Sequence, residues 1–172
     1  MVDSHDAGVM EQALRICGAG HFLNSVSLED ETHLRRVCGL AGRYGAGVVI
    51  ACRDEEGPAI DRHRKLDAAL RAVDRGAVAP ESAIIDLLAF PAATLPDGLK
   101  ESLAAIELVK HASPGVSTLL ALSNFSFGMP APERKAFERN ILLSAASAGL
   151  DYVILNTRRH PCGGVYDSIP SV

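Results

Sequence analysis

The stretch AIIDLLAF, residues 83–90, is an apolar run that carries one carboxylate, Asp86. Runs that are nearly continuously apolar, rather than alternating, are typical of strands buried on both faces of a parallel sheet. A carboxylate inside such a run must find hydrogen-bond donors or take up a proton. We therefore interpret 83–90 as a buried strand and Asp86 as a candidate functional residue.

Four further apolar runs share this character, and segments with helical spacing separate them. The runs are HFLN (21–24), GVVIAC (47–52), STLLALS (117–123) and DYVILN (151–156). The apolar stripes between the runs include Met10 and Leu14; Leu34 and Val37; Leu66, Leu70 and Val73; Ile106 and Val109; and Ile141 and Leu142. With a strand fragment at the start of the chain, this alternation predicts a parallel sheet with helices outside it.

Two architectures fit a parallel sheet of this kind, an open doubly wound sheet and a (β/α) barrel. The sequence has neither the GxGxxG fingerprint nor the P-loop expected of nucleotide-binding doubly wound folds. Polar side chains recur where each apolar run ends, namely Asp3, Asn24, the 53–55 group, Asp86, Asn124 and Asn156. In a barrel these ends converge on one mouth, where functional sites are built, so the pattern favours the barrel.

The alternative interpretation is that Asn and Asp simply favour turns, and it accounts for Asn156 and Asp54 without any function. Asp54 and Glu55, in the segment RDEEG, are either contacts to a substrate or solvated loop acids. Asp86 fits the turn interpretation poorly because four apolar residues follow it.

Length and composition predict one domain spanning residues 1–172, with 160–172 as loop and tail. The chain has 172 residues, a formal charge of -4, 48% hydrophobic and 22% charged residues, which is enough for a substantial core. No basic stripe, bilayer-length apolar run or signal peptide is evident, so we expect a cytoplasmic protein that binds neither nucleic acid nor membrane.

The four cysteines and six histidines show no ligand spacing, so we expect no bound metal. Cys17 and Cys38 fall on apolar helical stripes and Cys52 ends an apolar run, which is typical of buried free thiols. We interpret the histidines as solvated or capping residues.

Four motifs occur in order at the ends of the expected strands: VDS (2–4), LNSVSLED (23–30), IIDLLAFP (84–91) and LSNFSFGMP (122–130). Together they resemble the pterin-binding methyltransferases. This family comprises the methyltetrahydrofolate:corrinoid/iron-sulfur protein methyltransferases and the folate domain of cobalamin-dependent methionine synthase. The resemblance covers nearly the whole chain, and YDSIP (166–170) fits it as well. It implies a TIM (β/α)8-type barrel of the dihydropteroate-synthase-like class that binds methyltetrahydrofolate and passes its N5 methyl group to cob(I)alamin on a corrinoid protein.

By the same resemblance, the family's pterin-contacting aspartate and asparagine fall on Asp3 and Asn24. Its second pterin-contacting aspartate falls on Asp86, and its mobile asparagine near N5 falls on Asn124, the expected catalytic residue. These residue types suit the chemistry, because a carboxylate can accept two hydrogen bonds from the planar N–H edge of a pterin. A neutral amide near N5 can either donate or accept as the charge on that nitrogen changes.

The chain departs from the family pattern at three places. It begins inside the first motif, so we expect an incomplete barrel of about six of the eight strands, with the N-terminal units missing. A homo-oligomer such as a dimer, or a second chain, would then complete the barrel. Leu87 replaces the family's proline after the aspartate, and Ala121 or Leu122 replaces a glycine and is expected to crowd the pterin ring.

Three functions remain open on the sequence alone. The resemblance implies a methyltransferase if the barrel is completed. A truncated folate-binding or inactive remnant is the second reading. A dihydropteroate-synthase-like enzyme is less favoured, because Asn124 and Phe125 follow Ser123 where that enzyme carries a lysine. Phe125, Phe127 and Met129 are either core residues or a surface for pterin or partner.

Overall fold

The computed structural model describes residues 1–158 and 160, and six of its strands form one parallel sheet in the order β1-β2-β3-β6-β7-β8. The strands are β1 (Val2–Asp3), β2 (Phe22–Val26), β3 (Gly47–Ala51), β6 (Ala83–Asp86), β7 (Ser117–Ala121) and β8 (Tyr152–Ile154). The long helices are α1 (Ala7–Cys17), α2 (Glu31–Tyr44), α3 (Arg62–Gly76), α4 (Gly98–Ala112) and α6 (Ala131–Ser147). The short elements are η1 (Leu28–Asp30), β4 (Arg53–Asp54), β5 (Gly57–Pro58), η2 (Pro80–Ser82) and α5 (Leu122–Phe125).

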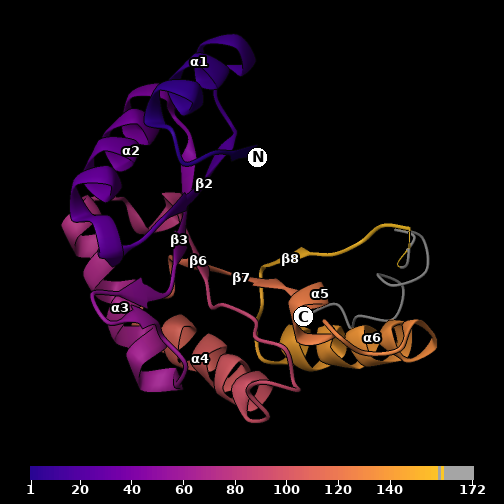
Figure 1. Cartoon of the computed structure of the whole chain (residues 1–172). Coiled ribbons are helices and arrows are strands. Elements are labelled where there is room, and N and C mark those ends of the chain that lie inside the picture. The colour runs from indigo at the N-terminus through magenta and orange to yellow at the C-terminus, as the bar shows by residue number, and fades with distance from the viewer. Residues whose placement is uncertain (159, 161–172) are drawn as a thin grey trace.

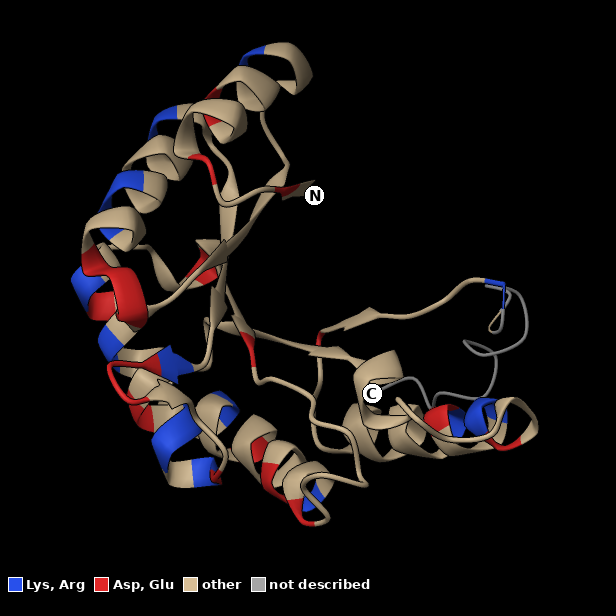
Figure 2. Cartoon of the chain, viewed as in Figure 1, with Lys and Arg blue, Asp and Glu red and all other residues tan. Residues whose placement is uncertain are grey.

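The sheet curls into an arc with the long helices along its outer, convex side and an open concave side (Figure 1). A doubly wound sheet would carry helices on both faces, so that alternative is wrong. The prediction of an incomplete barrel with six strands is confirmed. The charged residues lie mainly on the outer helices, where blue and red segments alternate (Figure 2).

Both faces of the sheet are apolar, which is why the strand sequences are nearly continuous rather than alternating. Val48, Ile50 and Ile85 face the helices and belong to the main core, whereas Val49 and Ile84 form an inner cluster with Leu119 and Phe22 on the concave face. Burial of each such side chain stabilises the fold by about 1.5–3 kcal/mol.

An aromatic contact crosses the concave face. The rings of Phe22 in β2 and Tyr152 in β8 lie edge to face with their centroids 5.8 Å apart. Three strands separate β2 from β8 in the sheet, so only a strongly curled sheet brings these side chains together.

Local sequence sets the helix ends. Asp6 caps α1 by accepting hydrogen bonds from the backbone N–H groups of Gly8 and Val9 at 2.7 and 3.3 Å, an interaction that stabilises a helix by about 1 kcal/mol. Gly45 ends α2 in the left-handed conformation, with φ of 63°.

The buried face of α3 differs from the predicted stripe. Leu66 and Val73 pack only partly against the core and Leu70 is 38% exposed. The buried positions of the helix are other residues, which apart from the lysine are small: Lys65, Ala68, Ala69, Ala72 and Gly76. Small residues let α3 lie close to the sheet and its neighbours, so the larger side chains move to the sides of the helix.

Other predictions about individual residues were wrong. Cys17 is exposed at the end of α1, whereas Cys38 and Cys52 are buried as expected. His160 is 2% exposed rather than solvated, and its Nε2 lies 2.6 Å from Oε2 of Glu138, a buried residue of α6. Cys162 and the remaining tail residues 161–172 lie outside the described residues.

Within the described part of the chain, no helix is both long and apolar enough to cross a membrane. The same residues contain no group of three or more His, Cys, Asp or Glu side chains that could hold a metal ion.

Candidate functional site

The carboxyl ends of the six strands lie along one edge of the sheet because all the strands are parallel. Asp3 ends β1, and its register partner in β2 is Asn24. Asp86 ends β6 and pairs with Ala51 of β3. Alternation along the strands places Asn24 on the same face as Phe22, and Asp86 on the same face as Ile84. All three polar residues therefore point to the concave side of the sheet.

Asp3 and Asn24 are in direct contact. The side-chain amide of Asn24 donates a hydrogen bond to Oδ1 of Asp3 at 3.1 Å. This bond uses one amide N–H and one carboxylate oxygen. Among the described residues, the second N–H and the oxygen of the amide and Oδ2 of Asp3 form no further hydrogen bond. Asp3 is exposed and Asn24 is half-buried, so both are accessible from the concave side.

Asp86 is half-buried at the end of β6. Its Oδ1 accepts a hydrogen bond from the backbone N–H of Leu88 at 2.9 Å. Burial raises the pKa of Asp86, while the Leu88 N–H and the charge of Lys65 act in the opposite direction. Its other oxygen accepts no hydrogen bond from the residues that the structure describes. Asp86 is thus a carboxylate that is costly to keep ionised and has an oxygen available to a donor.

A cavity of about 540 Å³ opens at this edge of the sheet beside Asp86. Its lining includes Asp86 and Leu88 from β6 and the loop after it, Ala51 and Arg53 from β3 and β4, and Ser25 after Asn24. Asp3, Asn24 and Asn124 are not part of this lining. The structure therefore brings Asp3 and Asn24 together and places Asp86 in a cavity that begins beside them.

Asn124 lies in α5, which directly follows β7, rather than at the end of the strand itself. It is exposed, and its backbone carbonyl accepts a hydrogen bond from the N–H of Phe127 at 3.3 Å. Phe125 is fully buried, whereas Phe127 is 71% exposed. The short helix thus sits at the carboxyl edge of the sheet with Asn124 and Phe127 facing solvent.

The substituted positions differ in where their side chains lie. Leu87 and Leu122 are buried in the main core on the helix side of the sheet. Ala121 is half-buried and pairs with Ile154, and its methyl group is the smallest side chain after glycine. The expectation that Leu122 crowds the concave face is therefore wrong.

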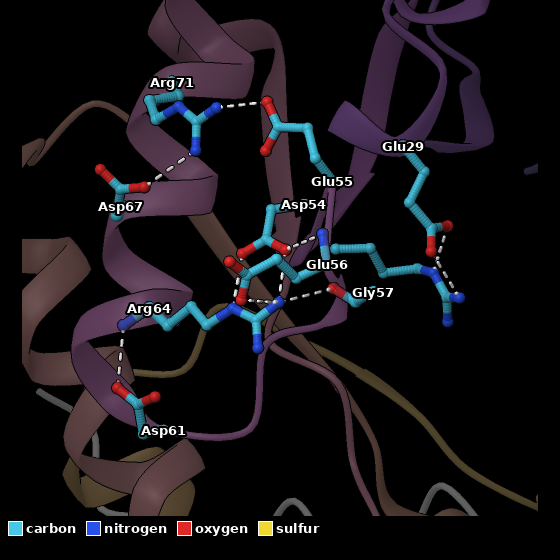
Figure 3. A network of polar contacts seen from close by, with 10 residues as sticks. Glu29, Asp54, Glu55, Glu56, Gly57, Asp61, Arg64, Asp67 and Arg71 are labelled. Carbon is cyan, nitrogen blue, oxygen red and sulfur yellow. Dashed lines mark hydrogen bonds and ion pairs between the residues drawn. The ribbon is translucent and has the colours of Figure 1, made fainter.

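The acidic segment after β3 forms ion pairs rather than a substrate surface. Asp54 is 6% exposed, and its Oδ2 accepts a hydrogen bond from Nε of Arg64 at 2.6 Å. This arginine lowers the pKa of Asp54. Figure 3 shows Arg64 and Arg71 of α3 facing Asp54 and Glu55. The β4–β5 hairpin is thereby fixed to α3. Oδ1 of Asp54 also accepts a hydrogen bond from the backbone N–H of Glu56 at 2.8 Å, which confirms the interpretation of Asp54 as a turn residue, whereas the interpretation as a solvated acid is wrong.

Sequence reasoning missed Lys65, whose side chain is fully buried and hydrogen-bonded to the segment that follows Asp86. Lys65 belongs to the basic cluster RHRK (62–65), whose composition is typical of a solvated turn of a helix and does not indicate a buried lysine. Only the tertiary packing of α3 shows which member of this cluster enters the core.

The sequence profile of pterin binding enzymes matches residues 1–156 of this chain. The chain therefore belongs to the pterin binding enzyme family.

Methionine synthases are among its relatives. The chain is 33% identical to methionine synthase of Mycobacterium tuberculosis (strain ATCC 25618 / H37Rv) and 31% identical to that of Mycobacterium leprae (strain TN). Each alignment includes 92% of this chain but only 14% of the relative, so the chain spans a small part of these enzymes.

Among solved structures, the fold resembles dihydropteroate synthase from Thermus thermophilus in complex with 6HMPPP, with a TM-score of 0.63. The match covers 98% of this chain and 69% of that one at 23% identity. At this identity the similarity establishes the shared barrel-type fold.

Proposed function

We propose that the chain binds methyltetrahydrofolate at the carboxyl edge of its sheet, through Asp3, Asn24 and Asp86, and serves in transfer of the N5 methyl group to cob(I)alamin carried by a corrinoid protein. The observation that carries the proposal is the common orientation of these three side chains toward the concave face, with a 540 Å³ cavity beside Asp86. The family match and the methionine synthase relatives support a pterin as the ligand.

The hydrogen-bonding groups fit a pterin ring. A pterin presents a ring N–H next to an exocyclic amine, a planar donor pair that a carboxylate accepts in the way it accepts a guanidinium. Asp86 has an oxygen available for this, and the Asp3–Asn24 pair adds both donors and acceptors for the ring edge. A carboxylate whose pKa is raised by burial gains from receiving donors, so binding relieves part of its desolvation cost.

Asn124 is proposed as the residue that responds to N5. In methyl transfer the N5–CH3 bond breaks and its electron pair stays on N5, so a hydrogen bond or proton at N5 makes it a better leaving group. An amide accelerates the step only if its hydrogen bond strengthens in the transition state. Asn124 is exposed on α5 and lies outside the cavity, so this role requires it to move toward the ligand.

The test is isothermal titration of the full chain with methyltetrahydrofolate, followed by a methyl-transfer assay with cob(I)alamin as acceptor. We expect binding by the wild type, loss of binding in Asp86→Ala, and normal binding with slowed transfer in Asn124→Ala. Asp74→Ala, at an exposed position of α3, is the matched control and should behave as the wild type.

The outcomes separate the proposed functions. Binding without any transfer would support a folate-binding module instead of a methyltransferase. Absence of binding by the wild type would refute both. If Asn124→Ala lost affinity while Asp86→Ala kept it, the proposed roles would be reversed.

A further inference from the structure

Lys65 is a fully buried cation, 0% exposed, in the helix that covers β3 and β6. Burying an ammonium group is costly unless all of its hydrogens find acceptors. Burial lowers the pKa of Lys65 to about 8. No carboxylate forms an ion pair with it among the described residues, so its position needs another explanation.

The three hydrogens of the ammonium group meet three acceptors. Nζ donates to the backbone carbonyl of Leu87, to that of Leu88 at 3.0 Å and to Oγ of Ser102 at 3.3 Å. Ser102 in turn donates to the Leu88 carbonyl at 3.1 Å, and Nζ lies 5.2 Å from the centre of the Phe90 ring. Apart from Ser102, every one of these groups belongs to the segment that follows Asp86.

One peptide unit joins this arrangement to Asp86. The carbonyl of Leu87 and the N–H of Leu88 belong to the same peptide group, and they bind Lys65 and Oδ1 of Asp86 respectively. A cation on the carbonyl oxygen polarises the peptide and strengthens its N–H as a donor. Leu88 also has a left-handed backbone, with φ of 54°, a conformation that is unfavourable for a residue with a side chain. Lys65 binds the carbonyls on both sides of this residue.

We propose that Lys65 is a positioning residue of the pterin site, which acts through the Leu87–Leu88 peptide to hold the Asp86 carboxylate in its ligand-accepting orientation. This inference rests on the proposed function, because it assigns Asp86 to the ligand. It adds a role for a group that is not itself part of the cavity lining but binds the backbone of Leu88, which is.

The charges around Lys65 support an effect of Lys65 on Asp86. Its positive charge lowers the pKa of Asp86 against the opposing effect of burial. Three other groups raise the pKa of Lys65: the Cys52 thiol after β3, Asp61 at the start of α3 and Glu101 of α4. Glu101 is already paired with Arg62. Lys65 is therefore the cation that favours the ionised form of Asp86.

The experiment compares Lys65→Met with the wild type in two measurements on the full chain. The first is the affinity for methyltetrahydrofolate, and the second is the titration of the Asp86 carboxyl carbon by NMR without ligand. We expect Lys65→Met to bind at least tenfold more weakly and its Asp86 to titrate at a higher pH. Lys135→Met, an exposed lysine of α6, should leave both unchanged.

Each result supports or overturns the inference. Wild-type affinity and wild-type Asp86 titration in Lys65→Met would overturn it. If the wild type itself fails to bind, the proposed function fails, while the ligand-free titration still decides the role of Lys65. If Lys65→Met does not fold, Ser102→Ala can replace it, because this variant keeps the cation and removes one of its acceptors. For Ser102→Ala we expect roughly threefold weaker binding and a smaller rise in the pH at which Asp86 titrates. No change in either measurement would overturn the inference.

Discussion

Asp86→Asn should separate stability from ligand binding at the proposed site. The substitution keeps the shape of the side chain, and the asparagine oxygen can still accept the Leu88 N–H that now reaches Oδ1 at 2.9 Å. The loop after β6 should therefore keep its conformation. What changes is the second oxygen, which becomes an N–H donor, and the negative charge, which is lost.

The loss of affinity can be worked out from these two changes. A hydrogen bond to a charged group contributes about 1.5–3 kcal/mol, and a neutral one about 1 kcal/mol. Removing one charge-assisted bond to the pterin and weakening the other costs about 3–4 kcal/mol in total. At roughly 1.4 kcal/mol per tenfold change in affinity, binding should weaken by about 100- to 1,000-fold.

The free energy of unfolding should increase in Asp86→Asn, although the affinity for the ligand falls. Burial raises the pKa of Asp86 above its value in the unfolded chain, so the folded state binds more protons and the free energy of unfolding falls as pH rises through that interval. Asparagine does not titrate, so the variant avoids this loss. Asp86→Asn should be more stable than the wild type at pH 7, and the difference should disappear at acidic pH where Asp86 is protonated in both states.

Isothermal titration with methyltetrahydrofolate and urea unfolding from about pH 3 to about pH 7.5 provide the two measurements. Asp74→Asn on the surface of α3 is the matched charge control. A variant that binds like the wild type, or one that is less stable than the wild type at pH 7, would refute the reasoning.

Three further outcomes are expected. His160→Ala should lower the free energy of unfolding by about 1–3 kcal/mol, because it removes a buried hydrogen-bond partner of Glu138. An unchanged urea midpoint would contradict this. Cys17 is exposed and should react with a thiol reagent in the native chain far faster than Cys38 or Cys52. Burial raises the pKa of Cys38 to about 11 and that of Cys52 to about 12. Peptide mapping by mass spectrometry would show the order in which the three cysteines react. Light scattering after size exclusion should give more than the monomer mass, because no described strand pairs with the outer side of β1 or of β8. A monomer at micromolar concentration would show that these edges are protected.

The sheet and the polar side chains along its carboxyl edge could be predicted from the sequence because both depend on local patterns. Continuous apolar runs indicated two-sided burial, and the structure shows it in Val48 and Val49, which face opposite sides of β3. Asp3 and Asn24 are the polar residues at which two apolar runs end, so their place at the ends of neighbouring strands could be predicted from the sequence. Their mutual hydrogen bond depends on the pairing of β1 with β2, which the pattern does not contain.

The parts that could not be predicted depend on tertiary packing. Asn124 was expected to end a strand, but the chain turns into α5 after Ala121, since a short helix allows Phe125 to reach the core. Lys65 and Arg64 are neighbours in one basic cluster, yet one lies in the core and the other pairs with Asp54. The spacing of this cluster does not distinguish Lys65 from Arg64. Lys65 is buried because α3 packs against the loop after β6 at that position.

The order of strands in the sheet follows their order in the chain, without an intervening jump. A nascent chain emerging from the ribosome can therefore add each strand of this sheet to an edge that already exists, since each strand after β1 pairs with the strand of the same sheet that precedes it in the chain. The pair of Asp3 and Asn24 is complete once β2 has docked, before Asp86 has been synthesised. The proposed ligand-binding edge can thus be assembled in chain order, with Asp86 joining Asp3 and Asn24 when β6 pairs with β3.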